Sequence, residues 1–592
     1  MEIWKQCYIL HNLYPISLIK TMRNQEIAGI FNEIAELLEI KEENPFRIRA
    51  YRRAAQNISG LTEDIAVLCQ KNRLENIPGI GRDLAGKIKE ILNTNRLGYY
   101  EELKSTVPSA IIKFMTVSGI GPKTAKLIHE KLQIDTLDAL EKYARANKIA
   151  GLPGIKEKTQ ENIIKGIELQ KRFSGRMLLS EAMSLSEEII FSLKKLTPIK
   201  RIEAAGSLRR KKETVRDIDI LATSENAEEV MDKFTRLPLV RQILAKGETK
   251  SAIITKDNVQ VDLRVVEAES FGAALCYFTG SKEHNIHLRD MAKRKGIKIN
   301  EYGVFQKQQK RSLAGKDERD VYRVLGLSYI EPELREDKGE IEAAKKHNLP
   351  QLITGKDIRG DLHVHTSYSD GAYKLEDMVA AAIKRGYAYI AITDHSPGLG
   401  VAGGLKEKEL KIVIKKIHRL NKRYKNFTIL CGTEVDIHSD GTLDYPDEVL
   451  KELDLVIAAV HSGFKQSEEM ITKRIITAMK NKHVHIIAHP SGRLLKEREP
   501  YALNWDEVIK AAADTNTALE INAYPKRQDL NDLIARRARE EGIKLAINTD
   551  AHLIEQLDFI KYGIYLARRA WCRKTDILNT LPVGQLLEVI KK

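Results

Sequence analysis

The sequence predicts a multidomain chain with an α-helical N-terminal region, a mixed α+β middle region and a C-terminal β/α barrel. Its 592 residues are too many for one domain at roughly 100–200 residues per domain. A glycine turn followed by a helical pattern occurs three times before residue 170. From residue 359 onward, short apolar runs alternate with amphipathic helical segments. Such alternation indicates a parallel sheet or a barrel.

Composition limits the class of protein. With 43% hydrophobic and 30% charged residues, the chain has material for several packed cores. The net charge of +15 favours a polyanionic partner, with nucleic acid the first candidate, although a solvated basic surface has the same charge. Five scattered cysteines without a CxxC pair fit free thiols in a reducing cytoplasm. No run approaches the ~20 apolar residues of a membrane span, so we expect no membrane-spanning segment. We also expect the chain to be a cytoplasmic monomer.

Patterning divides the chain into seven segments. Residues 1–21 lack the features of a signal peptide, and Met22 opens a helical pattern, so we expect translation to begin there. Residues 336–358 are polar without strong periodicity, which predicts a linker. The predicted segments are 1–21 (extension), 22–97 and 98–175 (helical), 176–270 and 271–335 (mixed), 336–358 (linker) and 359–592 (barrel).

The helical half repeats a turn that suits a phosphate. The stretches 77–92, 117–132 and 152–167 each place a glycine turn before a helix. A helix start offers free N–H groups and a positive dipole end, and such contacts read the nucleic-acid backbone rather than its sequence. Glycines that only end a helix are the alternative, but repetition in a basic chain favours DNA binding. The stretches resemble helix-hairpin-helix motifs, with Gly79, Gly81, Gly119 and Gly121 as the expected contacts.

Paired aspartates mark a second site. Asp217 and Asp219 flank Ile218, so on a strand both carboxylates project from one face. Asp262 lies in another alternating run, which a neighbouring strand could bring alongside. Three carboxylates can hold two metal ions, and hard oxygen ligands suit Mg²⁺ or Mn²⁺. We therefore expect Asp217, Asp219 and Asp262 to be catalytic and to bind two Mg²⁺.

A turn before the aspartates suits a triphosphate. The backbone of Gly206, the hydroxyl of Ser207 and the guanidinium groups of Arg209 and Arg210 together provide phosphate donors. This turn followed by DxD resembles the nucleotidyltransferase superfamily. A DxD pair alone is common on protein surfaces, so the prediction depends on the combination.

"CYFTGSKEHNIHLRD" (276–290) resembles the sugar-sensing turn of family X DNA polymerases. The resemblance implies that Tyr277, Phe278 and Gly280 line the deoxyribose pocket. It also implies that Asn285 contacts the nucleotide and Arg289 the DNA. A buried aromatic turn is the alternative. Lys282 departs from the aspartate often found in vertebrate members, so no base-stacking role is carried over.

Lys87 occupies the place of a lysine that attacks abasic sugars in family X polymerases. Such a nucleophile needs a depressed pKa. We favour an ordinary solvated helix lysine, because Lys89 and other lysines share the helix.

Nine residues with metal-ligand side chains occur in the C-terminal half, most of them at the ends of apolar runs. The C-terminal strand ends of a β/α barrel meet on one face, so these residues are expected to gather in one bowl. Imidazole with carboxylate suits Zn²⁺, Mn²⁺ or Fe²⁺, in two or three ions. Structural histidines are the alternative, and we assign His418, His438, His483 and His485 to that class. The nine are His363, His365, Asp370, His395, Glu434, His461, His489, Asp550 and His552.

This pattern resembles the PHP (polymerase and histidinol phosphatase) domain, a distorted seven-stranded barrel with a trinuclear phosphoesterase site. The resemblance implies Zn²⁺ or Mn²⁺ there. Arg493, just after the His489 motif, is our candidate for a phosphate clamp. The implied ligand sets are His363, His365, Glu434 and Asp550 for one ion, Glu434, His461 and His489 for a second, and Asp370, His395 and His552 for a third.

Taken together, the motifs resemble a bacterial or archaeal family X DNA polymerase with a C-terminal PHP domain. The resemblance implies filling of short gaps in base excision repair, with deoxynucleoside triphosphates and gapped or primer–template DNA as substrates. It also implies 3′→5′ exonuclease activity, with 3′-phosphatase or abasic-site endonuclease activity as additions. Two alternatives stay open: a template-independent nucleotidyltransferase, and a small-molecule phosphatase joined to a DNA-binding module.

Overall fold

The computed structural model describes residues 15–59, 65–77, 79–94, 96–117, 120–173, 175–306 and 312–591. Residues 1–14 and Gly119 therefore lie outside the described residues. Helix α2 begins at Pro15, so it includes the last residues of the expected extension 1–21. The chain forms two compact units, residues 1–172 and 173–592. None of the helices described combines the length and apolar character that crossing a bilayer requires.

The first unit is helical. A single hydrophobic core cluster runs from Ile27 to Ile167, across the expected segment boundary at residues 97 and 98. Helix α5 shows how it forms: Leu84, Ile88 and Ile91 recur at helical spacing and are buried. The helices are α2 (Pro15–Ile40), α3 (Pro45–Ser59), α4 (Ile65–Gln70), α5 (Arg82–Thr94), α6 (Gly98–Ser105), α7 (Ser109–Met115), α8 (Pro122–Leu132), α9 (Leu137–Arg145) and α10 (Glu157–Phe173).

The second unit begins with a five-stranded sheet, in the order β2-β4-β7-β6-β5, with helices α11 and α13 packed against it. Strands β4 and β7 pair in parallel, and the other pairs are antiparallel. We call residues 176–270 the palm. Its elements are β1 (Met177–Leu178), α11 (Leu179–Leu196), β2 (Ile199–Ala204), α12 (Gly206–Arg209), β3 (Thr214–Val215), β4 (Asp217–Ser224), α13 (Ala227–Thr235), β5 (Val240–Lys246), β6 (Lys250–Thr255) and β7 (Gln260–Val265).

Residues 271–335, which we call the thumb, combine helices with a three-stranded antiparallel sheet in the order β10-β9-β8. The following segment 336–358 differs from the expected featureless linker. It contains helix α17, whose Ile341 and Ala344 are buried in the thumb core. The elements are α14 (Phe271–Thr279), α15 (Lys282–Arg294), β8 (Ile297–Asn300), β9 (Gly303–Gln306), β10 (Ser312–Ala314), α16 (Glu318–Val324) and α17 (Glu340–Lys345).

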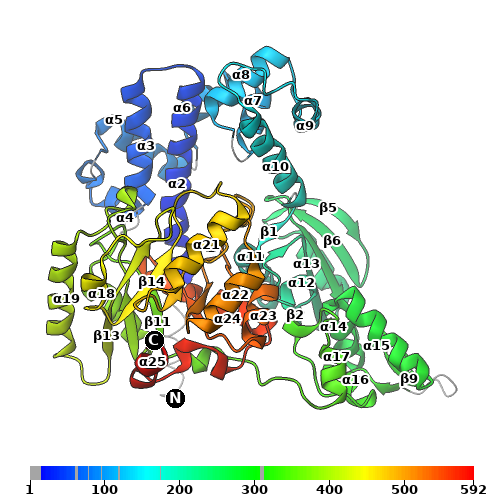
Figure 1. The fold of residues 1–592 in the computed structure, drawn as a ribbon. Helices are drawn as coiled ribbons and strands as arrows, with labels where there is room; N and C mark the ends of the chain where they lie inside the picture. The colour runs from blue at the N-terminus through cyan, green and yellow to red at the C-terminus, as the bar shows by residue number, and fades with distance from the viewer. Residues whose placement is uncertain are drawn as a thin grey trace. The chain divides into compact units, whose positions relative to one another are not determined.

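The C-terminal part is a seven-stranded, fully parallel sheet in sequential order from β11 to β17. A parallel bridge between Val364 and Ala551 brings its first and last strands together, which confirms the predicted distorted barrel. Figure 1 shows its helices in colours from yellow-green (α18 and α19) to red (α25). The strands are β11 (Gly360–Val364), β12 (Tyr389–Ile392), β13 (Thr428–Asp436), β14 (Leu455–Ala459), β15 (Ile486–Ile487), β16 (Ala518–Asn522) and β17 (Leu545–Asn548).

Helices connect the barrel strands, as parallel pairing requires. Every strand of the barrel is buried along its whole length except at Thr428, so its interior is a packed core. The helices are α18 (Leu375–Lys384), α19 (Glu407–Asn421), α20 (Asp447–Leu450), α21 (Glu468–Met479), α22 (Trp505–Asp514), α23 (Asp532–Glu540), α24 (Ile560–Arg569) and α25 (Val583–Val589).

Two candidate metal centres

The first centre lies on the palm strands β4 and β7. Parallel pairing puts Asp219 opposite Asp262, while Ile218 is buried on the other face. Burial, and then the charges of Asp217 and Asp262, raise the pKa of Asp219 to about 6. The three aspartates thus feel one another's charge. Their oxygens do not all lie within 4.8 Å of one another, unlike those of the barrel clusters below.

The turn at Gly206 is built around Asp219. Gly206 has a φ of +61°, and a Cβ there would lie 2.4 Å from Asp219 Oδ2. Only glycine therefore lets the backbone approach this carboxylate so closely. Ser207 follows as the second residue of the short helix α12.

The thumb turn meets Arg210. Arg210 Nη1 donates to the carbonyl oxygen of Thr279, and Arg210 Nε donates to Glu336 at 3.0 Å. A Cβ at Gly280 would lie 3.2 Å from the same Nη1. The structure thus brings the 206–210 turn and the 277–280 turn together.

Other predicted residues of the thumb lie close to this turn. Tyr277 and Phe278 form an edge-to-face pair with ring centroids 5.1 Å apart. Asn285 Nδ2 donates to the carbonyl oxygen of Tyr277 at 2.7 Å, which ties helix α15 to the turn. Arg289 is exposed on α15, and its Nε donates to the carbonyl oxygen of Asn285.

Arg209, which we expected to donate to a phosphate, pairs with the carboxylate of Glu318. Its two terminal nitrogens each donate to one oxygen of Glu318 at 2.8 Å. Burial would raise the pKa of Glu318, but Arg335 and Arg209 hold it well below its usual range. Both terminal nitrogens of Arg209 are thus engaged by Glu318, and Nη1 also donates to Thr279 Oγ1 at 2.8 Å. The sequence pattern could not reveal this, because Glu318 lies 109 residues away.

The described glycine turns of the first unit have the expected form. Gly79 has a φ of +80°, and Gly121 is the N-cap of helix α8, whose first residue is Pro122. Gly81 precedes helix α5. Lys87, on α5, pairs with Asp83 at 2.5 Å and lies over the Tyr99 ring. The Lys87 side chain is 14% exposed, so it is less solvated than the ordinary helix lysine that we favoured.

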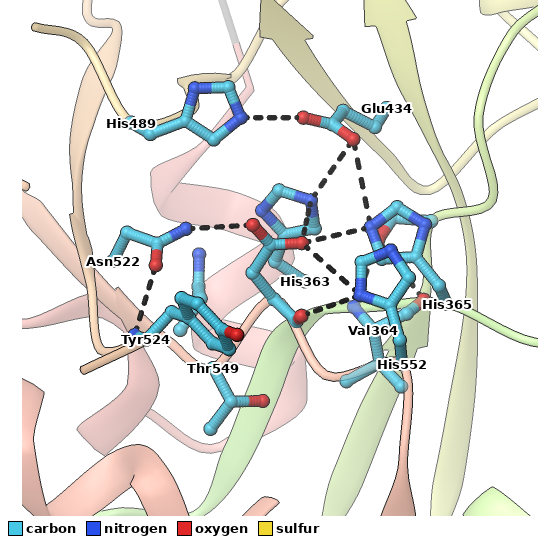
Figure 2. Close-up of polar contacts among 12 residues, drawn as sticks. His363, Val364, His365, Glu434, His489, Asn522, Tyr524, Thr549 and His552 are labelled. Carbon is cyan, nitrogen blue, oxygen red and sulfur yellow. Dashed lines mark hydrogen bonds and ion pairs between the residues drawn. The ribbon is translucent and has the colours of Figure 1, made fainter. Parts of the chain in front are cut away.

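The second centre occupies the barrel, where all nine predicted residues come together. Glu434 on β13 is at its middle: its Oε2 lies 2.9 Å from His395 Nδ1 and 3.4 Å from His363 Nε2. Its Oε1 lies 3.2 Å from His461 Nε2 and 3.0 Å from His489 Nε2. Figure 2 shows Glu434 facing the rings of His363, His365 and His489.

Two further carboxylates complete the centre. Asp550 Oδ1 lies 3.2 Å from His365 Nε2. Asp370 approaches His395 at 3.5 Å and His552 at 3.3 Å. Three groups have ligand atoms within 4.8 Å of one another: His365 with Asp370, His395 and His552; His363 with His365 and Asp550; and His395 with Glu434 and His461.

The donor atoms of this centre fit metal ions. Among the described residues, His363 Nε2 and His365 Nε2 are buried without a hydrogen bond, which is costly unless another partner binds them. Burial, with His552 and His395, lowers the pKa of His365 to about 3, so this ring is neutral as a metal ligand must be. Burial would raise the pKa of Glu434, but His461, His363 and His395 hold it well below normal.

A further residue, Glu520, supports the ligands and was missed by the sequence reasoning. It lies on β16, fully buried, and its Oε1 is 2.8 Å from His363 Nδ1. Its Oε2 accepts from the backbone N–H of His489 at 2.7 Å. The signal was a carboxylate at the centre of the apolar run "ALEINA".

The structure corrects the assignment of Arg493. Its Nη2 pairs with Glu213 of the palm at 2.8 Å, and its Nε donates to the carbonyl oxygen of Arg527. The neighbouring Arg527 lies nearer the ligands: its Nε is 3.6 Å from Asp550 Oδ2. Within the described residues, its Nη1 is buried without a hydrogen-bond partner.

Comparisons with known proteins agree with this geometry. Family descriptions match as follows: a helix-hairpin-helix domain at residues 22–97, a SAM-like helix-hairpin-helix tandem at 111–169, the DNA polymerase beta thumb at 274–336 and a PHP domain at 361–524. The chain is 38% identical to the DNA polymerase/3′-5′ exonuclease PolX of Bacillus subtilis over 573 residues, 96% of this chain and 100% of that protein.

Two other relatives match shorter stretches of the chain. A probable phosphatase of Thermoanaerobacter sp. is 34% identical over 244 residues, 39% of this chain and 94% of that protein. DNA polymerase lambda of Rattus norvegicus is 26% identical over 291 residues, 44% of this chain and 48% of that protein. The full-length similarity shows that the chain belongs to the family X DNA polymerases that carry a C-terminal PHP domain.

Proposed function

We propose that the chain is a template-directed DNA polymerase that fills short gaps in base excision repair, and that its barrel removes nucleotides from DNA 3′ ends. The observation that carries the proposal is the presence of two separate carboxylate-bearing centres in one chain. One pairs Asp219 with Asp262 on parallel strands. The other gathers eight ligand-type side chains in three groups in the barrel, and His489 joins them through Glu434. Full-length similarity to a DNA polymerase/3′-5′ exonuclease supports it.

In the palm, we propose that Asp217, Asp219 and Asp262 hold two Mg²⁺. The raised pKa of Asp219 supports this, because nearby carboxylates repel until cations lie between them. The turn at Gly206 and Ser207, with Arg210, would bind the triphosphate through N–H, hydroxyl and guanidinium donors. Tyr277, Phe278, Gly280 and Asn285 would form the wall of the deoxyribose pocket.

In the barrel, we propose that the nine side chains hold two or three ions, Zn²⁺ or Mn²⁺. Bound divalent ions activate water and neutralise the charge that develops on phosphate oxygens. Glu520 holds His363 so that Nε2 points into the cluster, and Arg527 would contact the phosphate in place of Arg493. The Gly-turn helices of the first unit and exposed Arg289 would contact the DNA backbone, with one chain acting as a monomer.

Separate variants test the two centres. With a labelled gapped duplex, Asp217→Ala should abolish synthesis and keep 3′→5′ degradation, and His363→Ala should do the reverse. Exposed Asp257→Ala and His418→Ala are matched controls that should keep both activities. Loss of both activities in either active-site variant would contradict two independent centres.

The preferred substrate of each activity separates the alternatives. A template-independent nucleotidyltransferase would extend single-stranded DNA as well as the gapped duplex. A small-molecule phosphatase would hydrolyse p-nitrophenyl phosphate far better than a DNA 3′ end. We expect gapped DNA to be the preferred substrate for synthesis and DNA 3′ ends to be preferred for degradation.

A further inference from the structure

Helix α24 of the barrel packs against the palm. Tyr562 on this helix belongs to the same hydrophobic core cluster as Ile218 and Ile220 of strand β4. Lys211 of the palm places its Nζ 4.6 Å above the centre of the Tyr565 ring. These contacts join α24 to the palm; Figure 1 labels α24 among the orange helices of the barrel.

Arg569, the last residue of α24, connects this helix to the 206–210 turn. Its side chain is 5% exposed. Its Nη1 donates to the carbonyl oxygen of Arg210 at 3.0 Å and lies 3.1 Å from Glu336 Oε1. Its Nη2 donates to the carboxylate of Asp532 in the barrel. One guanidinium therefore joins the barrel, the palm turn and the segment after the thumb.

Glu336 is shared between two arginines. The Oε1 atom that accepts from Arg569 also accepts from Arg210 Nε at 3.0 Å. Burial would raise the pKa of Glu336, but Arg569, Arg210 and Lys212 lower it, so the group is a carboxylate. Without Arg569, this carboxylate would have Arg210 as its one close guanidinium partner and would compete with an anionic ligand for it.

The geometry leaves one edge of Arg210 available. Nε is held by Glu336 and Nη1 by the carbonyl oxygen of Thr279, while Nη2 has no hydrogen-bond partner among the described residues. A guanidinium fixed at two nitrogens and open at the third is preorganised to bind a phosphate oxygen.

We propose that Arg569, a residue of the barrel, positions Arg210 for the incoming nucleoside triphosphate. Helix α24 is then part of the nucleotide-binding machinery of the palm. This inference rests on the proposed function, in which Arg210 contacts the triphosphate. Arg569 acts through Arg210 and Glu336, so it is a positioning residue.

The test is Arg569→Lys in the full-length chain, with nucleotide addition measured on a gapped duplex. Lysine keeps the charge, but one ammonium cannot replace the fork that reaches Arg210, Glu336 and Asp532 together. We expect the KM for the nucleotide to rise about tenfold, with kcat and 3′→5′ degradation within about twofold of the parent; tenfold corresponds to about 1.4 kcal/mol. A purely structural role would lower kcat and both activities together, which would overturn the proposal.

The neighbouring residue Arg568 gives a matched control. It lies on the same helix and pairs with Glu333 at 2.8 Å, three residues from Glu336, and among the described residues it makes no hydrogen bond or ion pair with Arg210. Arg568→Lys should leave the nucleotide KM unchanged. An equal rise in this variant would show a general effect of loosening α24 and would overturn the proposal.

Two further variants keep the inference separate from the proposed function. If Arg210→Lys raises the nucleotide KM and Arg569→Lys does not, the positioning role is wrong and the function stands. If Arg210→Lys leaves the KM unchanged, the proposed role of Arg210 itself is wrong. Should Arg569→Lys fail to fold, Glu336→Gln replaces it: a changed nucleotide KM supports the shared carboxylate, and an unchanged KM overturns it.

Discussion

Glu520 offers a sharp test of the barrel centre. Its two oxygens serve four donors: Oε1 faces His363 Nδ1 at 2.8 Å and Asn548 Nδ2 at 2.9 Å, and Oε2 faces the His489 N–H at 2.7 Å and Asn522 Nδ2 at 3.2 Å. In Glu520→Gln, one oxygen becomes an NH₂ group. Whichever way the amide points, two of the four donors then meet another donor instead of an acceptor.

The expected loss follows from these contacts. A carboxylate that accepts from a ligand histidine fixes its tautomer and raises its basicity, and losing it costs about 10–100-fold in metal affinity. This range equals about 1.4–2.8 kcal/mol. Because Glu520 touches His363 and the backbone of His489 but not Asp370, ions held through Asp370 and His552 should be less affected.

Direct metal binding checks this prediction. Calorimetric titration of the metal-free protein with Mn²⁺ should show weaker affinity in Glu520→Gln for at least one ion, while nucleotide addition at the palm is kept. The exposed Glu468→Gln, on helix α21 of the same barrel, is the control and should bind as the parent does. Unchanged stoichiometry and affinity in Glu520→Gln would refute the reasoning.

Three other predictions concern single contacts. In the metal-free protein, Asp219→Asn should raise the free energy of unfolding at pH 7.5 by up to about 3 kcal/mol, seen as a higher thermal midpoint, because the pKa of Asp219 is raised from 3.8 to about 6. The effect at pH 4 should be small, since the raised pKa destabilises the fold above about pH 6 and not below the unfolded pKa, and with Mg²⁺ the sign should reverse. Gly206→Ala should cut nucleotide addition more than about tenfold and spare degradation, since its Cβ would lie 2.4 Å from Asp219; equal loss of both would contradict this. Arg527→Gln should raise the KM for DNA 3′ ends in degradation without releasing metal, as measured by elemental analysis; metal loss would instead show a structural role.

Several features could be predicted from the sequence because their geometry is local. Alternation along a strand predicts that Asp217 and Asp219 share a face, and the structure pairs Asp219 with Asp262 on the neighbouring strand. The convergence of strand ends in a β/α barrel predicted a single bowl, and the structure gathers all nine ligand-type residues in it. The two-residue period of a strand is enough for the first prediction. The convergence of strand ends in a β/α barrel is enough for the second.

The tertiary structure alone decided which polar groups are already occupied. Arg209 and Arg210 are adjacent, yet one is held by Glu318 and the other shares Glu336 with Arg569. Such pairings join residues more than 100 positions apart. They depend on how the thumb and helix α24 pack against the palm, which local periodicity does not encode.

In the barrel, too, some features followed from the sequence and others only from the folded structure. The sequence by itself determined the ligand types and their places at strand ends, because a strand end needs only local pattern to recognise. Only the folded chain revealed that Glu520 orients His363, and that Arg527 lies nearer the ligands than Arg493. The physical reason is that the direction of a side chain and the partner it meets are set by packing between segments remote in sequence.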